Sequence, residues 1–275
     1  MGTMGTMGSM GTLRTLILLA ALAFSLCCVA RAEVKTEAHV YKHGETVLEG
    51  VLAYDPAAQE KRPGVLVIHD WKGPGEFSTG RAERLAALGY VALAVDIYGQ
   101  GVRPQTPQEA GKQAGLYKGD RALMRARILA AFETLKKHAK VDGARIGAIG
   151  YCFGGTVALE LARSGAAVSG VVSFHGGLAT PNKEDAKNIK GKVLVLHGAD
   201  DPHVNAEEVA AFQEEMRQAK VDWQFVAYGN AVHSFTNPKA GNDNSKGAAY
   251  NAKAEQRSWE ALQAFFAESF RLPAP

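Results

Sequence analysis

The sequence predicts an α/β protein with a mostly parallel central sheet flanked by helices on both faces. Short apolar or β-branched runs recur along the chain, and continuous runs of this kind are typical of strands that are covered on both faces. Segments with helical spacing lie between several of these runs, and such alternation favours parallel strands joined by right-handed crossovers. The chain has 275 residues, of which 47% are hydrophobic, so one domain of this class can bury a sizeable core.

The elements follow one another along a single expected domain, residues 33–275. Val40–Ala53 predicts an antiparallel hairpin at its start. Strands are then expected at Gly64–Ile68, Val91–Val95, Ile146–Ile149, Gly170–Phe174, Val193–Leu196 and Trp223–Ala227. Helical spacing marks Ser78–Leu88, Asp120–His138, Gly155–Ala162 and Ala206–Gln218, and the last segment, Lys246–Phe270, ends in an amphipathic stretch. The polar tract Asn237–Gly247 predicts a loop.

The first 32 residues are expected to be a secretory signal rather than part of the fold. Arg14 precedes an apolar run from Leu16 to Val29, and the small residues Ala30-Arg31-Ala32 follow it. A positive residue, a short apolar stretch and an A-x-A site are typical of such a signal. We therefore expect the mature chain to begin near Glu33 and to be exported, to a bacterial periplasm or out of the cell. The alternatives are an uncleaved anchor and a lipoprotein at Cys27 or Cys28.

Charge and cysteine content narrow the classes of function. Lysine and arginine exceed aspartate and glutamate by three, 31 against 28. This near balance argues against dedicated binding to nucleic acid or to an anionic membrane surface. Removal of the signal would leave Cys152 as the single thiol. A lone thiol is either buried and inert or used for its chemistry.

The residues around Cys152 favour chemistry. The run Gly150-Tyr151-Cys152-Phe153-Gly154-Gly155 follows an expected strand and opens an expected helix, so it matches the G-x-C-x-G form of a nucleophile elbow. Glycines avoid clashes at this sharp turn, and the turn raises the thiol into the cleft beyond the strand's carboxyl end. The helix amino terminus favours the thiolate and presents the Phe153 amide to a developing oxyanion. A second amide is expected from the loop after an early strand, where Trp71 is the candidate.

A nucleophile of this kind needs a base and an orienting acid. In this fold the acid comes after the nucleophile and the base comes last. The turn after one of the later strands offers both Asp200 and Asp201, and His233 follows the final expected strand, where the base belongs. His175 ends the strand beside the elbow and is a candidate for lining the cavity. His69 ends an early strand and is expected to support the oxyanion loop.

These residues lie in sequence blocks that resemble the dienelactone hydrolase family of α/β-hydrolases. The blocks are VLVIHDWKGPG (65–75), LGYVALAVDIYGQG (88–101), IGAIGYCFGG (146–155), HGADDPHV (197–204) and GNAVHSF (229–235), and the match extends from about Val47 to Phe270. The resemblance implies an α/β-hydrolase fold and a Cys–His–Asp triad, carried here by Cys152, His233 and Asp201. It also implies an oxyanion hole formed by the amides of Trp71 and Phe153.

Two positions depart from the family's pattern. Asp70 stands where the family's reference enzymes carry a glutamate that contacts the resting thiol, and Asn237 stands where they carry an arginine that binds the substrate carboxylate. The resemblance therefore implies the hydrolytic machinery more strongly than it implies a dienelactone substrate. Substrate-binding or supporting roles are expected of four residues, which are Asp70, Tyr98, His175 and Asn237.

The sequence thus predicts a hydrolase that cleaves a carboxylic ester or lactone through a thioacyl-enzyme intermediate. A general carboxylesterase or thioesterase of the same fold is an alternative, and so is a secreted binding protein with a vestigial site. Hydrolysis by a triad needs no cofactor, and the sequence shows no cluster typical of a metal site. The expected partner is a small-molecule ester or lactone, with no nucleic acid and no stable membrane insertion once the signal is removed. The oligomeric state stays open.

Overall fold

The computed structural model describes residues 1–2 and 33–271. Most of the predicted signal, residues 3–32, lies outside this described part. Residues 33–271 build one eight-stranded sheet whose strand order is β1-β2-β4-β3-β5-β6-β7-β8. Among the residues described, no helix combines the length and the apolar character needed to cross a bilayer.

The strands agree closely with those that the sequence predicts. They are β1 (Lys35–His43), β2 (Thr46–Tyr54), β3 (Arg62–Ile68), β4 (Val91–Val95), β5 (Val141–Tyr151), β6 (Gly170–Phe174), β7 (Lys192–Gly198) and β8 (Trp223–Tyr228). The first two form the predicted antiparallel hairpin, and β2 pairs with β4 in antiparallel fashion. All other pairs are parallel. The carboxyl ends of six strands therefore meet at one edge of the sheet, where ligands bind in such folds.

The helices include one that the sequence analysis missed. They are α1 (Glu76–Ala86), α2 (Pro107–Gly119), α3 (Arg121–Lys136), α4 (Phe153–Arg163), α5 (Ala206–Gln218) and α6 (Ala252–Ser269), with short 3-10 turns η1 (Lys183–Asn188), η2 (Pro238–Ala240) and η3 (Asn244–Lys246). Helix α2 was not predicted. The final helix begins at Ala252, and not at Lys246 as the sequence predicted. Lys246 is the last residue of η3, and an irregular segment leads from it to the helix. The expected polar loop 237–247 contains η2 and η3.

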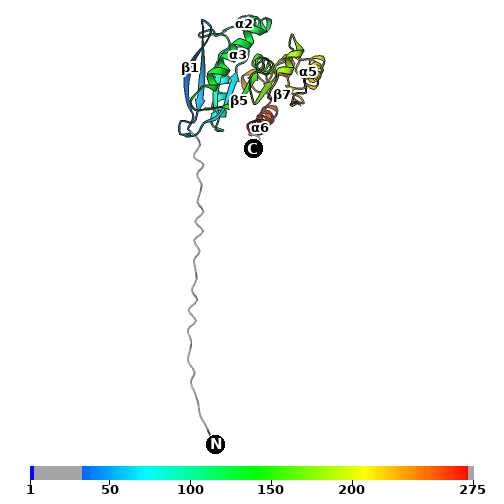
Figure 1. Ribbon diagram of the computed structural model, residues 1–275. Coiled ribbons are helices and arrows are strands. Elements are labelled where there is room, and N and C mark those ends of the chain that lie inside the picture. Colours follow the sequence, from blue (N-terminus) through cyan, green and yellow to red (C-terminus); the bar gives the residue numbers. More distant parts are fainter. Residues whose placement is uncertain (3–32, 272–275) are drawn as a thin grey trace. The chain divides into compact units, whose positions relative to one another are not determined.

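Helices cover both faces of the sheet, as predicted. On β3, Leu66 and Ile68 belong to one apolar cluster with residues of α3, α4 and α5, whereas Val65 and Val67 belong to a second cluster with residues of α1 and α6. This alternation follows from the two-residue period of a strand, which sends successive side chains to opposite faces. In Figure 1, α2 and α3 lie near β1, and α5 lies toward the opposite end of the sheet, beyond β7.

Candidate active site

Cys152 lies in a strained turn between β5 and α4. Its φ is 55° and its ψ is −114°, a conformation that residues with a side chain rarely adopt. A Cβ on Gly150 would lie 1.9 Å from the carbonyl oxygen of Gly154, and a Cβ on Gly154 would lie 2.5 Å from the carbonyl oxygens of Ile68 and His69. These contacts explain why the elbow requires glycine two residues before and after the thiol.

The acid comes from the turn that follows β7. The Oδ2 of Asp201 accepts a hydrogen bond from Nδ1 of His233 at 2.8 Å, and its Oδ1 accepts one from the His203 amide at 2.8 Å. Asp201 is buried, whereas Asp200 is exposed. The geometry therefore places Asp201, and not its neighbour Asp200, against the imidazole.

His233 lies between this carboxylate and the Cys152 thiol. Burial alone would lower the pKa of His233, but hydrogen bonding to Asp201 and interaction with Cys152 raise that pKa to about 10. The loop that carries the ring is held by a short parallel bridge to Ala248, in which the His233 amide donates to the Gly247 carbonyl. The arrangement can therefore keep an imidazolium beside the sulfur of Cys152 at neutral pH.

Cys152 and His233 open into one cavity of about 540 Å³. Most of its other lining residues are small or apolar. They are Trp71, Gly111, Ala114, Gly115, Lys118, Gly177, His203, Val204, Ser234 and Ala248. A concave, largely apolar chamber with a few convergent polar groups is the usual form of a small-molecule site.

Two backbone amides near Cys152 have no partner in the described chain that would compete with a ligand. Trp71 lines the cavity, and its amide donates no hydrogen bond to any other residue of the described chain. Phe153 is the first residue of α4, so its amide is one of those that a helix leaves unpaired at its start. Both amides can thus donate to an oxyanion formed at a carbonyl carbon bonded to Cys152.

A family model for the dienelactone hydrolase family matches residues 48–270. The chain belongs to the dienelactone hydrolase family. A solved structure named m3DLH is 44% identical, with a TM-score of 0.83, over 86% of this chain and 99% of that one. A dienelactone hydrolase-like promiscuous phosphotriesterase from metagenomic libraries is 43% identical, with the same TM-score and the same coverage. An uncharacterised protein of Caenorhabditis elegans is 39% identical over 150 residues, which are 54% of this chain and 94% of the relative.

Family membership confirms the predicted α/β-hydrolase fold and the predicted enzyme class. The chain is a dienelactone hydrolase-like carboxylic ester hydrolase. This result favours hydrolysis over the alternative that sequence analysis left open, a secreted binding protein with a vestigial site. It does not by itself assign chemistry to individual residues, which depends on the geometry of the site.

Two of the predicted supporting residues of this dienelactone hydrolase-like enzyme contact residues that line the cavity. The hydroxyl of Tyr98 donates to the Trp71 carbonyl at 3.0 Å. The ring of His175 meets that of His233 edge to face, with centroids 5.1 Å apart, and its Nε2 lies 2.8 Å from the Thr236 hydroxyl. Burial lowers the pKa of His175 well below its usual value. The supporting role of Tyr98 and His175 stays a prediction, and His175 is not among the residues that line the cavity, contrary to expectation.

The other two supporting candidates lie outside the cavity. Asp70 accepts a hydrogen bond from the Lys72 amide, and the side chain of Asn237 accepts one from the Lys239 amide, which caps η2. Both line a separate hollow beside the amino terminus of α1. Neither contacts the space that Cys152 and His233 share, so their positions offer no support for a role in binding the reacting ester.

Sequence analysis missed the wall that α2 contributes to this family member's cavity. Gly111, Ala114, Gly115 and Lys118 line it from one side of that helix. His203, whose ring lies edge to face against His233 at 5.0 Å, lines it as well. A sequence signal for α2 did exist in the run Thr106-Pro107-Gln108-Glu109. Thr106 caps the helix by accepting from the Glu109 amide, and the Glu109 carboxylate accepts from the Gln105 amide.

The wall on the other side is a loop after β6 that begins with Gly176 and Gly177. The hydroxyl of Thr156 donates to the Gly177 carbonyl at 2.9 Å. At the next residue, Glu208 of α5 accepts from the Leu178 amide at 2.6 Å, and Arg163 of α4 donates to the Leu178 carbonyl at 2.9 Å. Three side chains from two helices therefore fix this loop.

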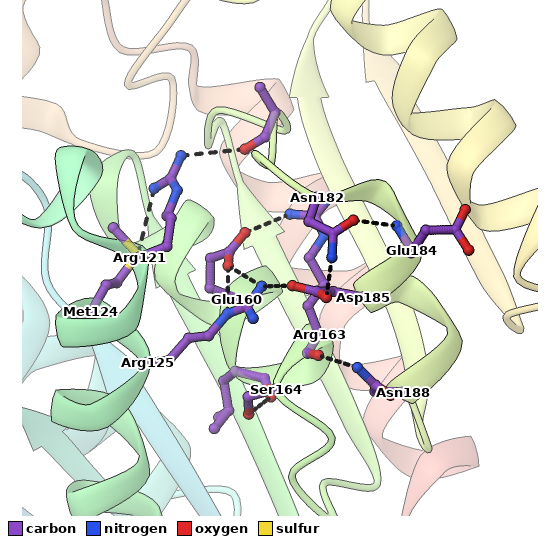
Figure 2. Close-up of polar contacts among 12 residues, drawn as sticks. Arg121, Met124, Arg125, Glu160, Arg163, Ser164, Asn182, Glu184, Asp185 and Asn188 are labelled. Atoms are coloured by element: carbon purple, nitrogen blue, oxygen red, sulfur yellow. Dashed lines mark hydrogen bonds and ion pairs between the residues drawn. The ribbon is translucent and has the colours of Figure 1, made fainter.

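Arg163 is itself held in a buried ionic network. Figure 2 shows Glu160 shared by Arg163 and by Arg125 of α3, which also pairs with Asp185. Arg163 further binds Glu215 of α5, and the side chains of Glu160, Arg163 and Glu215 are 0–3% exposed. Buried ion pairs contribute little net stability but are costly to break. The network therefore ties α3, α4 and α5 together at fixed positions behind the cavity wall.

Proposed function

We propose that this chain hydrolyses carboxylic esters or lactones with Cys152 as nucleophile, His233 as base and Asp201 as the group that orients the base. The observation that carries the proposal is the 2.8 Å hydrogen bond between Nδ1 of His233 and the Asp201 carboxylate. The imidazole that makes this bond lines the same cavity as Cys152, whose backbone is strained. The order nucleophile, acid, base along the chain is that of other α/β-hydrolase sites.

The reaction follows from these positions. The Cys152 thiolate attacks the carbonyl carbon, a C–S bond forms, and the carbonyl π electrons move to oxygen. The amides of Trp71 and Phe153 stabilise that oxyanion. The C–O bond to the leaving group then breaks, and the imidazolium of His233 gives its proton to the departing oxygen, which leaves a thioacyl enzyme.

Water completes the cycle. His233, now neutral, takes a proton from a water molecule that attacks the thioacyl carbon. The second oxyanion collapses, the C–S bond breaks, and the acid product leaves with Cys152 restored as thiolate beside the imidazolium. Because a thiolate is also a good leaving group, activated esters, enol lactones and thioesters are better substrates than amides.

A substrate panel tests this proposal. The purified mature chain, residues 33–275, is assayed against para-nitrophenyl acetate, an enol lactone, an unactivated alkyl ester and an acyl thioester. The expected result is turnover of the activated ester and the lactone, with a loss of roughly three or more orders of magnitude in Cys152→Ala. Cys152→Ser is the matched variant that keeps a nucleophilic atom. Activity of Cys152→Ala that equals that of the wild type would refute the assignment.

A second activity is favoured by one comparison. The promiscuous phosphotriesterase that is 43% identical covers the same part of the chain at a TM-score of 0.83. We propose that the same thiolate attacks neutral phosphotriesters in the apolar cavity, with the same two amides on the phosphoryl oxygen. Hydrolysis of para-nitrophenyl diethyl phosphate that disappears in Cys152→Ala would support this activity, and hydrolysis that persists there would contradict it.

A further inference from the structure

The peptide group that joins Asp70 to Trp71 is held at its carbonyl end. The ring nitrogen Nδ1 of His69 lies 2.6 Å from the Asp70 carbonyl oxygen, and the Gly73 amide donates to the same oxygen at 3.2 Å. The N–H of this peptide belongs to Trp71, and in a planar trans peptide it points away from the C=O. Whatever fixes the Asp70 carbonyl therefore fixes the direction of the Trp71 amide.

The tautomer of His69 is set by the backbone around it. Its Nε2 lies 3.3 Å from the Ile97 amide, which can only donate, so Nε2 is the acceptor and carries no proton. The proton of the neutral ring is then on Nδ1, from which it is donated to the Asp70 carbonyl. His69 is 1% exposed, and burial lowers its pKa. The ring therefore stays neutral and keeps this tautomer at neutral pH.

A second contact holds the other side of Trp71. The Tyr98 hydroxyl donates to the Trp71 carbonyl at 3.0 Å. Tyr98 is 3% exposed, and its own backbone is fixed because its amide and that of Gly99 both donate to the carboxylate of Asp96 at 2.9 Å. The two peptides that flank Trp71 are thus tied to rigid parts of the protein at β3 and β4.

The same two rings contact the residue that carries the other free amide. The ring of Phe153 is stacked on that of His69 at 5.8 Å and tilted against that of Tyr98 at 5.5 Å. His69 and Tyr98 also contact each other edge to face at 4.7 Å. One aromatic cluster therefore fixes Trp71 and Phe153 relative to each other.

We infer that His69 and Tyr98 are positioning residues for the oxyanion site: His69 aims the Trp71 amide through the Asp70 carbonyl, and Tyr98 holds the Trp71 carbonyl. The inference rests on the proposed function, since the two residues would help to stabilise the oxyanion that forms when Cys152 adds to a carbonyl. It can be tested by comparing reactions of the thiol that form an oxyanion with one that does not. Loss of these contacts must weaken steps that create an oxyanion and leave other reactions of the thiol unchanged.

Alkylation by iodoacetamide is a reaction of the Cys152 thiol in which no oxyanion forms. The Cys152 sulfur displaces iodide from a saturated carbon, a C–S bond forms, and no carbonyl oxygen gains charge. In Tyr98→Phe we expect kcat for para-nitrophenyl acetate to fall about tenfold, less than the loss on deleting an oxyanion donor. KM, the rate of alkylation and the pH profile of alkylation stay within about twofold of the wild type. Tyr90→Phe is the matched control, because the Tyr90 hydroxyl makes no hydrogen bond to the described residues and its partly buried ring packs against the apolar cluster on the other face.

Addition of Cys152 to trifluoroacetone forms an oxyanion that does not go on to a product. Its carbonyl carbon bonds to the sulfur of Cys152, the π electrons move to oxygen, and nothing leaves. Its affinity is measured by protection of the thiol from iodoacetamide. We expect about tenfold weaker protection in Tyr98→Phe and in His69→Leu. We expect near wild-type protection in His69→Asn, because the Asn side-chain amide nitrogen can take the place of Nδ1.

The outcomes separate the two proposals. Unchanged kcat and unchanged ketone protection in Tyr98→Phe would overturn the positioning role, and so would an equal loss of hydrolysis and alkylation. If the wild type hydrolysed no ester of the panel while ketone protection still depended on Tyr98, the proposed function would fail and the positioning role would stand. Tyr98→Phe removes one atom, so it serves as the test if His69→Leu does not fold.

Discussion

Asp201→Asn tests the electrostatics of the site most directly. The substitution keeps the size of the side chain and can keep the 2.8 Å bond that Oδ1 accepts from the His203 amide. It removes the charge next to His233, however, and it can present an NH₂ group to Nδ1. His233 then loses both its counter-charge and the acceptor that sets its tautomer.

The magnitude follows from the pKa of His233. The site raises this pKa from 6.5 to about 10. Each pKa unit corresponds to about 1.4 kcal/mol, so the folded protein favours the protonated ring by about 5 kcal/mol in total. Burial opposes this preference, and Asp201 is the first of the two groups that raise the pKa. Without Asp201 we expect the pKa to fall by roughly two units or more, and kcat/KM for an activated ester to fall by roughly 10² to 10⁴.

The sign of the linked stability change is fixed by the raised pKa. The folded ring binds its proton more tightly than the unfolded one, so the stabilisation is fully present below pH 6.5 and is lost as the pH rises through about 10. The difference in unfolding free energy between the wild type and Asp201→Asn should therefore be large at pH 6 and should shrink above pH 10.

The assay is an NMR titration of the imidazole signals, combined with the rate of iodoacetamide alkylation against pH. Asp200→Asn is the matched control, since Asp200 is exposed and is the neighbour of Asp201 in sequence. We expect Asp200→Asn to leave the His233 midpoint unchanged. The reasoning is refuted if His233 of the wild type titrates below about pH 8, or if Asp201→Asn leaves its midpoint in place.

Three further predictions follow from the structure. No atom lies within 4 Å of a Cβ built on Gly115, so Gly115→Leu should fold and narrow the cavity. It should raise KM for bulky esters about tenfold and leave KM for para-nitrophenyl acetate unchanged. Gly80→Leu in α1 is the control, because a Cβ there also meets no atom within 4 Å. Burial lowers the pKa of His69, His175 and His197, so stability measured by urea unfolding should decrease as pH falls below 6.5, by up to about 1.4 kcal/mol per pH unit for each ring. Expression in a bacterial host with a secretion pathway should yield an exported chain whose mass places its amino terminus near Glu33, and an unprocessed chain would contradict the predicted signal.

The strands and the turn at Cys152 could be predicted because each has a local cause in the sequence. A strand covered on both faces must be apolar at successive positions, as Val65 to Ile68 are. A nucleophile elbow needs glycines where a Cβ would strike backbone, and the distances at Gly150 and Gly154 show that need directly. The choice between Asp200 and Asp201 was not local, because it depends on which side chain the turn directs toward His233.

The wall that α2 contributes to the cavity left only a weak periodic signal. Helix α2 buries only Ala110, Ala114 and Tyr117. Their i, i+4, i+7 spacing is helical, but two of the three are alanines, so the apolar stripe is short and weak. Its glycines at 111 and 115 face a cavity rather than a packed neighbour, and empty space leaves no hydrophobic signal. The Thr106 N-cap followed by Pro107 at its start was the available indication. A helix that lines a cavity with small residues is therefore hard to find by a search for buried apolar side chains.

Five non-glycine residues of the described chain have positive φ, and three of them lie near Cys152 and His233 at one edge of the sheet. These three are Cys152 at 55°, His175 at 41° and Ser234 at 58°. Each follows the end of a strand or adjoins His233, and each such conformation costs of order 1–3 kcal/mol. Strain of this size persists only where surrounding contacts determine the backbone. Here those contacts are the Cys152 amide donating to the Phe174 carbonyl, the His175 amide donating to the Leu196 carbonyl, and the bridge at His233. The parallel ladder thus positions the thiol and the imidazole as well as building the core. If the proposed function holds, we expect substitutions that loosen the ends of β5, β6 or β7 to lower activity more than they lower the free energy of unfolding.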